Sequence, residues 1–317
     1  MQVKVPKYIV AVSGGIDSVV LLDLLAKKKL VDFTSRSLFF EPEYKVVVAH
    51  FNHGIRSNSG DDARFVEELA ASYDMEFELG EAKLGPNTSE AKARDFRYDF
   101  LRHCCKEYNS SNIITAHHQD DLIETALINL LRGTSWRGMN SLKEFSKLDQ
   151  INIMRPLLSL PKSKLRNYAD INNLKWVEDS TNLDQDYLRN FVRLTLVPAA
   201  TANNPRFIPE LIELIENIQK LDPEIELELT KLNLQNSDQN KNEVTLSRYD
   251  FIMWPEIVAN EVVYKILRNL DMNWHPSKLQ ITKALHFIKT GLTGKRLEVG
   301  GGLELHLINK SVQFKKS

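Results

Sequence analysis

The sequence predicts an α/β protein in which a doubly wound parallel sheet is followed by a smaller C-terminal α+β domain. The first observation is a series of short apolar runs, rich in β-branched residues, within the first 120 residues. The second is the helix-like run that follows each of them, an alternation typical of a parallel sheet. The third is a change after about residue 222, where helical patterns precede alternating, strand-like ones. A chain of 317 residues is long enough for two domains.

The strands and helices of the sheet domain follow from these runs. The runs that predict strands are residues 8–12, 45–50, 75–79 and 112–117. The runs that predict helices are residues 17–29, 60–73, 89–108 and 119–131. In open α/β sheets, ligands bind beyond the carboxyl ends of the strands. We therefore expect functional residues where these strands end, at Ser13, His50 and His117.

The second half of the chain predicts a loop, several helices and a final pair of strands. Residues 132–142 contain glycines and mixed side chains, as loops do. Helical patterns occupy residues 161–174, which are basic, and residues 204–221, 260–270 and 276–291. Residues 233–243 are polar and predict a linker, while residues 295–316 alternate like two strands around a glycine turn. The predicted domains are residues 1–203 and 222–317, joined by a connecting helix over 204–221.

The net charge of −1 conceals four segments of alternating sign. Basic side chains exceed acidic ones by five in residues 132–206 and 251–317, and acidic ones prevail in residues 1–131 and 207–250. Two basic blocks suit a polyanionic partner, although scatter would look the same. No apolar run reaches the roughly 18 residues of a membrane helix, and the first residues lack a signal-peptide pattern. Because the two cysteines are adjacent and form no disulfide framework, we expect a cytoplasmic protein without a membrane partner.

A phosphate-binding loop is predicted between the first strand and the first helix, where the chain reads SGGIDS. Glycines let backbone N–H groups face inward, and the helix start adds unpaired N–H groups and a partial positive charge. Such a loop suits a phosphate or pyrophosphate, whereas a plain tight turn is the alternative. It is not a Walker A loop, because the chain contains no such motif. Asp17 fits an anion site only if a Mg²⁺ ion lies between its carboxylate and the phosphates.

Charged and imidazole side chains gather near the predicted strand ends. Asp121 and Glu124 are three residues apart on one helical face, where paired carboxylates suit an ammonium group and its deprotonation. A solvated acidic helix face is the alternative. Arg94 and Arg97 share another helix and suit an anionic intermediate or leaving phosphate, unless they pair with neighbouring aspartates. His117 suits a contact to a nucleotide or base; a competing zinc site lacks an evident third ligand.

The SGGIDS stretch resembles the PP-loop of the N-type ATP pyrophosphatases, which have an adenine nucleotide alpha hydrolase-like fold. Five further stretches, in order, resemble blocks of the tRNA(Ile)-lysidine synthetase family of that superfamily. They are VVAHFNHGIRSNS (47–59), EAKARDFRYDFL (90–101), TAHHQDDLIETALINLLRG (115–133), RPLLSLPKSKLRNY (155–168) and EDSTNLDQDYLRNFVR (178–193). The resemblance covers roughly residues 8–200, and the terminal TGKRLEVGGGLELHL more weakly resembles the family's C-terminal tRNA-contacting domain.

The resemblance implies a two-step reaction that uses ATP and Mg²⁺. ATP adenylates O2 of the wobble cytidine in tRNA(Ile) with the anticodon CAU, and pyrophosphate leaves. The ε-amine of free L-lysine then attacks carbon 2 and AMP leaves, so that the resulting lysidine changes codon reading from AUG to AUA. The implied partners are this tRNA and L-lysine. A homodimer is a further expectation, and the sequence leaves the oligomeric state open.

Together with the residue chemistry, the resemblance implies a role for each candidate. The implied ATP contacts are Ser13, Gly14, Gly15, Ile16, Asp17, Ser18 and His50, with Asp17 also the Mg²⁺ ligand. The implied catalytic residues are Asp17, Arg97 and Asp121, and the lysine-binding residues are Asp121 and Glu124. The implied contacts to the tRNA or its target base are Arg94, His117, Arg189 and Arg193. In the basic blocks, RNA phosphates are expected to bind Lys162, Lys164, Arg166, Lys315 and Lys316.

The sequence departs from the family pattern in two places, and it is also compatible with two other functions. The family pattern has a further glycine near Ser135 that this chain lacks, and residues 31–44 form a long helix-to-strand connection without a functional explanation. A tRNA thiolase on the same ATPase core would need a reactive cysteine, but Cys104 and Cys105 lie within a predicted helix, away from any strand end. A non-catalytic RNA-binding relative would have no need of the carboxylates of Asp17, Asp121 and Glu124.

Overall fold

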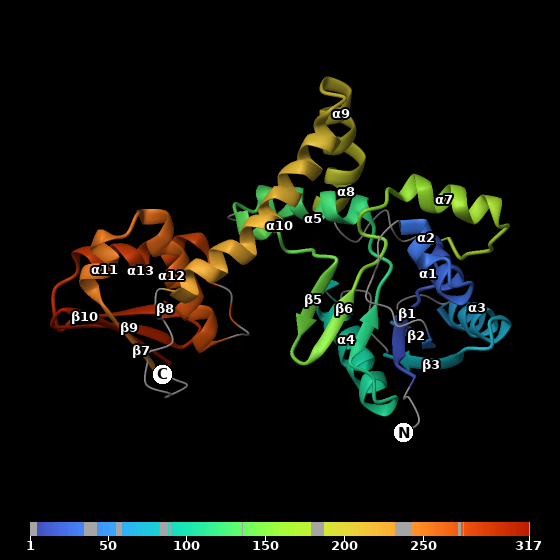
Figure 1. Cartoon of the computed structure of the whole chain (residues 1–317), viewed down its shortest axis with the longest axis horizontal. Coiled ribbons are helices and arrows are strands. Elements are labelled where there is room, and N and C mark those ends of the chain that lie inside the picture. Colours follow the sequence, from blue (N-terminus) through green and yellow to red (C-terminus); the bar gives the residue numbers. More distant parts are fainter. Residues whose placement is uncertain are drawn as a thin grey trace. The chain divides into compact units, whose positions relative to one another are not determined.

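The computed structural model describes residues 5–34, 43–54, 59–82, 88, 90–134, 136–178, 187–231, 243–271, 274 and 276–316. The chain divides into two compact units, which are described separately below (Figure 1). The N-terminal unit consists of Met1–Ile128 and Ser141–Leu211, and the C-terminal unit of Asn129–Asn140 and Ile212–Ser317. Part of the segment predicted as a loop over 132–142 therefore belongs with the C-terminal unit.

The N-terminal unit is built on a six-stranded sheet with the order β3-β2-β1-β4-β6-β5. Neighbouring strands are parallel, except that β5 pairs antiparallel with β6. The strands are β1 (Lys7–Ala11), β2 (Lys45–Asn52), β3 (Glu76–Glu81), β4 (Asn112–Ile114), β5 (Phe145–Leu148) and β6 (Ile151–Met154). The parallel arrangement confirms the predicted fold class, whereas the β5–β6 hairpin was not predicted.

The helices predicted between the strands are confirmed with small shifts at their ends. The helices of this unit are α1 (Ile16–Ala26), α2 (Leu30–Thr34), α3 (Ser59–Ser72), α4 (Glu90–Glu107), α5 (Gln119–Leu131), α7 (Lys162–Ile171), α8 (Tyr187–Phe191) and α9 (Val197–Asn203), with a π-helical turn at Val192–Leu196. The strand predicted over 112–117 is too long. It ends at Ile114 because the next residues leave the sheet and lead into α5.

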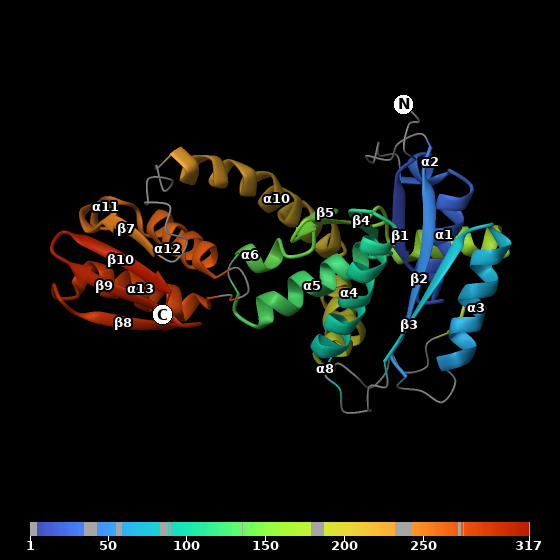
Figure 2. The same cartoon turned by 90° about the horizontal axis from the view of Figure 1, so that it is seen from below.

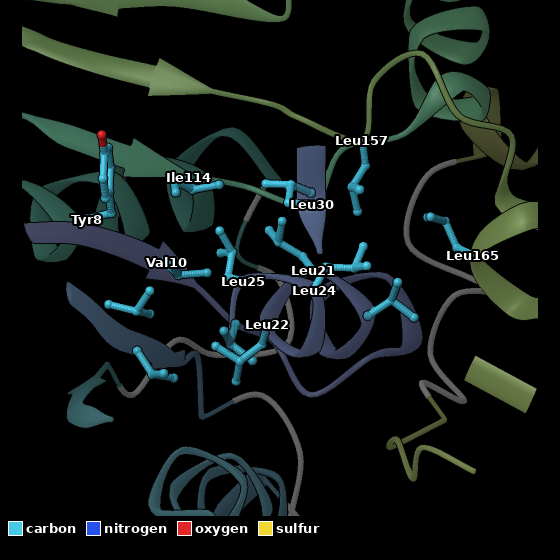
Figure 3. Packing of buried hydrophobic residues seen from close by; sticks show 14 of the residues in the cluster. Tyr8, Val10, Leu21, Leu22, Leu24, Leu25, Leu30, Ile114, Leu157 and Leu165 are labelled. Carbon is cyan, nitrogen blue, oxygen red and sulfur yellow. The ribbon is translucent and has the colours of Figure 1, made fainter. Parts of the chain in front are cut away.

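Helices cover both faces of this sheet, as the doubly wound prediction requires. Alternate residues of β1 point to opposite faces: Val10 joins a core with the leucines of α1, and Ile9 joins a core with Leu101 of α4. Figure 2 shows α1 and α3 on one side of β1–β3 and α4 on the other. The close packing of Val10 and Ile114 against α1 is visible in Figure 3. The apolar run through α1 is thus explained by burial, since Val19 to Leu25 are all buried.

The C-terminal unit combines helices with a four-stranded antiparallel sheet of order β7-β10-β9-β8. Its elements are α6 (Trp136–Met139), β7 (Glu243–Ser247), α11 (Arg248–Met253), α12 (Glu256–Leu270), α13 (Lys278–Thr290), β8 (Arg296–Gly300), β9 (Leu303–Ile308) and β10 (Ser311–Lys316). The indole Nε1 of Trp136 donates a hydrogen bond of 3.2 Å to Glu261 Oε1, which joins α6 to α12. Apolar faces of α12, α13 and the sheet form one core.

Two predictions in this half of the chain need correction. Residues 295–316 form three strands instead of two, because a second turn at Asn309, with a φ of 49°, reverses the chain again. The connecting helix predicted to end at residue 221 is α10 (Phe207–Lys231), which continues through Pro223. The acidic, Leu- and Ile-rich residues after 221 keep the helical pattern, and that signal outweighs the proline.

Several predicted features lie outside the described residues. These are Ser135, almost all of the linker over 233–243, and the central part of the 31–44 connection. Within the residues that the structure does describe, no helix is long and apolar enough to cross a membrane.

Candidate active site

The predicted phosphate loop connects β1 to α1, at the carboxyl end of the central strand (Figure 1). Gly14 has a φ of 90°, which a residue with a side chain rarely adopts. Two serines hold the loop closed: the Ser13 backbone N–H donates to Ser18 Oγ at 3.2 Å, and Ser18 Oγ donates to the Gly15 carbonyl at 2.8 Å. Gly15 caps α1 without a side-chain hydrogen bond, so the helix start keeps donors for an anion.

Asp17, in the first turn of α1, lies between two cationic groups. Its Oδ2 is 3.4 Å from His118 Nε2 and 3.3 Å from Lys162 Nζ. Burial alone would raise the pKa of this carboxyl, but the His118 hydrogen bond and the two positive charges outweigh it and lower the pKa. The other oxygen, Oδ1, is buried and has no partner among the described residues. Asp17 is therefore held ionised with one oxygen left for a further ligand.

His118 connects the phosphate loop to the start of α5. Its Nε2 lies 3.5 Å from Asp121 Oδ2 as well as near Asp17, and its backbone N–H donates to the same Asp121 oxygen at 3.0 Å. Burial lowers the pKa of His118, but Asp17 and Asp121 outweigh burial and raise it. The sequence did not assign His118 a role. Its position beside His117, between the end of β4 and the start of α5, was the available signal.

Asp121 and Glu124 lie on one helix, as predicted, but they have different partners. The Glu124 carboxylate is almost fully buried, and Arg193 binds it with two hydrogen bonds: Nε to Oε1 at 2.7 Å and Nη2 to Oε2 at 3.0 Å. Arg189 Nε donates to Oε2 at 3.2 Å. The structure thus brings a predicted lysine-binding carboxylate together with two predicted tRNA contacts. Both Glu124 oxygens are neutralised by arginines that lie more than 60 residues away in sequence.

The two histidines predicted at strand ends are held neutral by their surroundings. His50 is buried at the end of β2, and its Nδ1 lies 2.8 Å from the Val12 carbonyl, where only a protonated nitrogen makes a hydrogen bond. Burial lowers the pKa of His50. His117 Nδ1 pairs with Thr115 Oγ1 at 2.8 Å. Burial and the nearby charges of Arg155 and other arginines hold the pKa of His117 well below its usual value.

Arginines gather around Tyr98 on α4. The guanidinium carbons of Arg94 and Arg97 lie 4.9 and 5.6 Å from the ring centre of Tyr98, and Arg94 Nη2 donates to the phenol oxygen at 3.4 Å. Arg155, directly after β6, is only 4% exposed, and its Nη1 donates to the Lys143 carbonyl at 2.7 Å. Its Nε has no hydrogen-bond partner in the part of the chain that the structure describes. This cluster of three arginines suits an anionic group. Arg155 belongs to the cluster but was not predicted from the sequence.

The two cysteines pack in the sheet core and do not face the candidate site. Cys104 and Cys105 are free thiols, and both are buried on α4. Burial raises the pKa of Cys104 to about 12 and that of Cys105 to about 11, so neither thiolate forms near neutral pH. Among the described residues, no three His, Cys, Asp or Glu side chains form a group that could hold a metal. Neither a nucleophilic cysteine nor a zinc cluster is present in that part of the chain.

Known proteins share this loop and this sheet. Residues 2–200 match the family model of the PP-loop domain. The chain is 36% identical over 222 residues to a tRNA(Ile)-lysidine synthase of Thermosipho africanus, which is 68% of this chain and 49% of that protein. It is 34% identical over 242 residues to a tRNA(Ile)-lysidine synthase of Nitrosomonas europaea, which is 71% of this chain and 50% of that protein. The chain therefore spans about half the length of these relatives.

A solved structure supports the fold. The U34-tRNA thiolase NcsA of Methanococcus maripaludis, with its [4Fe-4S] cluster, aligns over 68% of this chain and 71% of its own, with a TM-score of 0.54 and 17% identity. At that identity the likeness concerns the fold alone. Since the family model covers more than half of the residues, including the SGGIDS loop, the chain belongs to the PP-loop family of ATP-binding domains.

Proposed function

We propose that this chain is a tRNA(Ile)-lysidine synthase, which ligates L-lysine to carbon 2 of the wobble cytidine in tRNA(Ile) with the anticodon CAU. The relatives named above carry that activity in their names. The observation that carries the proposal is the chain of contacts from Asp17 through His118 to Asp121, with distances of 3.4 and 3.5 Å. It joins the phosphate loop, where ATP is used, to the carboxylates that suit an amine.

In the first step, the α-phosphorus of ATP bonds to O2 of the cytidine and pyrophosphate leaves. The loop from Ser13 to Ser18 holds the phosphates through those backbone N–H groups that are not used in hydrogen bonds within the loop, and His50 braces its start through the Val12 carbonyl. The residues also fit Mg²⁺, which favours one or two carboxylates together with phosphate oxygens. Asp17 is ionised, and its buried Oδ1 has no partner among the described residues. When bound, the ion neutralises phosphate charge, and Asp17 is the residue that holds it.

In the second step, the ε-nitrogen of lysine bonds to carbon 2, the bond from carbon 2 to O2 breaks, and AMP leaves with that oxygen. The attacking amine loses a proton, for which Asp121 is the proposed acceptor. Arg94 and Arg97 stabilise the negative charge of the departing AMP, while the neutral His117 contacts the target base. Glu124 contributes to lysine binding only where the ammonium group displaces Arg189 or Arg193.

The C-terminal region is proposed to bind the tRNA body, with residues 222–317 as the binding domain and 204–221 as part of the connection. The weak resemblance of its last strands to the family's tRNA-contacting domain and its basic side chains support this assignment. The homodimer and the cytoplasmic location stay predictions.

The experiment that tests the function measures incorporation of labelled lysine and exchange of pyrophosphate into ATP. We expect both with tRNA(Ile) bearing CAU and neither with the methionine tRNA that has the same anticodon. Absence of AMP release with tRNA(Ile), lysine, ATP and Mg²⁺ together would contradict the proposal and favour a non-catalytic RNA-binding protein. For the thiolase alternative, activity of the Cys104→Ser, Cys105→Ser double variant is decisive, and we expect it to stay unchanged because both thiols are buried.

A further inference from the structure

The start of α7 contacts the phosphate loop through one lysine. Lys162 Nζ lies 3.3 Å from Asp17 Oδ2. The backbone N–H of the same residue donates to Asp120 Oδ1 at 3.2 Å, which fixes the start of α7 beside the start of α5. The sequence analysis placed Lys162 in a basic block for RNA, but its ammonium group lies at the nucleotide loop.

The environment of Lys162 suits a cation that changes partner. Its side chain is 44% exposed, so the contact with Asp17 is a partly solvated ion pair that contributes little to stability. The backbone is anchored by Asp120 while the flexible stem is free to move the charge by a few ångströms. Asp17 keeps His118 as its other partner when Lys162 leaves. A lysine at this place acts as a mobile point charge for phosphate oxygens.

The next basic residue of α7 shows why position in the basic block does not decide the role. Lys164 Nζ donates to the Phe33 carbonyl at 3.3 Å and lies 5.0 Å from the centre of the Phe33 ring. It is therefore held against α2, without a contact to the loop among the described residues. The two lysines are two residues apart and provide a matched pair for experiments.

We propose that Lys162 is a phosphate contact of ATP, and that it is the counter-ion of Asp17 only while the loop is free of nucleotide. When ATP binds, the ammonium group moves from Asp17 to the phosphate oxygens, and Asp17 becomes available for the metal. The inference rests on the use of ATP at this loop, and it requires neither lysine nor a particular tRNA as the co-substrate.

The test compares Lys162→Met, Lys164→Met and Lys162→Arg in the full chain. Equilibrium binding of ATP without tRNA gives the first readout, and filter binding of tRNA(Ile) without ATP gives the second. We expect Lys162→Met to weaken ATP binding about ten- to a hundredfold, since a charge-assisted contact is lost, and to leave tRNA affinity within twofold. Lys162→Arg restores most of the ATP affinity, whereas Lys164→Met leaves it unchanged. Thermal unfolding of each variant verifies that the fold is kept.

Three results would overturn the assignment. If Lys162→Met binds ATP like the wild type but loses tRNA affinity, the cation belongs to an RNA surface and the proposed function is unaffected. If the wild type itself binds no ATP, the nucleotide site fails, and with it both this inference and the proposed function. A salt dependence of tRNA binding that is shallower in Lys162→Met than in wild type would also assign the lysine to RNA.

Discussion

Two helices of this protein start in opposite ways. α13, in the C-terminal unit, begins with a capping box in which Ser277 Oγ accepts from the Gln280 backbone N–H and the Gln280 side chain accepts from the Ser277 backbone N–H. α1 begins at Gly15 without a side-chain cap, although its residues from Ser18 to Leu25 are all buried. The chain thus caps the start of α13 with its own side chains and leaves the start of α1 without a side-chain cap, where we propose that a ligand binds.

The missing cap is not sufficient to mark a site. α12 also begins without a side-chain cap, at Pro255, and the acidic residue of its first turn, Glu256, is exposed. The start of α1 differs because a carboxylate lies there between two cations with one oxygen unpaired among the described residues. The comparison indicates that the charges around an uncapped helix start, and not the missing cap alone, mark it as a candidate binding site.

Replacing Asp17 gives the largest expected effect. Asp17→Ala removes the carboxylate that we propose holds the metal at the phosphates, and we expect pyrophosphate release to fall below detection. The fold should survive, because the Lys162 pair is partly solvated and His118 keeps Asp121 as a partner. ATP–pyrophosphate exchange measures the loss of chemistry, and thermal unfolding measures whether the fold is kept. If Asp17→Ala releases pyrophosphate at the wild-type rate, the start of α1 is not a phosphate site that depends on this carboxylate.

Glu124→Gln is expected to have the next largest effect. A neutral amide binds an ammonium group less strongly, so the KM for lysine should rise about ten- to a hundredfold. Adenylation of the cytidine needs no lysine and should persist, so that adenylated tRNA accumulates. Steady-state kinetics with varied lysine, together with detection of the intermediate, tests this. Loss of adenylation at unchanged lysine affinity would show that Glu124 serves the fold through its arginines.

On the structural side of the comparison, Gly301→Ala should destabilise the C-terminal unit by about 2 kcal/mol. Gly301 has a φ of 62°, and an added Cβ would lie 2.6 Å from the ring of Trp274. Gly294→Ala is the matched control, since Gly294 has a φ of 84° but nothing within 4 Å of an added Cβ. Denaturant unfolding measures both. Equal losses in the two variants would mean that only backbone strain matters and the Trp274 contact does not.

Replacing Ser277, the cap of α13, gives the smallest expected effect. Ser277→Ala removes the cap of α13 and should lower the free energy of unfolding by about 1 kcal/mol. Pyrophosphate exchange should not change, because the residue lies in the C-terminal unit, away from the loop in sequence. A fall in exchange at full stability would instead connect this helix to the chemistry.

Local patterns predicted the sheet, the loop and the carboxylates on α5. A buried strand, two glycines and a Leu-rich helix are neighbours in sequence, so periodicity and residue type suffice there. The contacts of Glu124 with Arg189 and Arg193, and of Asp17 with Lys162, join residues 65 to 145 positions apart. No local pattern encodes such pairs. Arg155 was missed for the same reason: only the sheet order places the end of β6 beside β4 and His117.

The arginines on Glu124 also set a condition for selectivity. Because Arg189 and Arg193 belong to the same chain, they compete for the carboxylate at an effective concentration far above that of amines in solution. A small amine that offers only its positive charge is therefore a poor competitor. If Glu124 binds lysine as proposed, the ammonium group reaches it only when the rest of the molecule gains contacts elsewhere, and the tethered guanidinium groups would then act as a filter against simple cations.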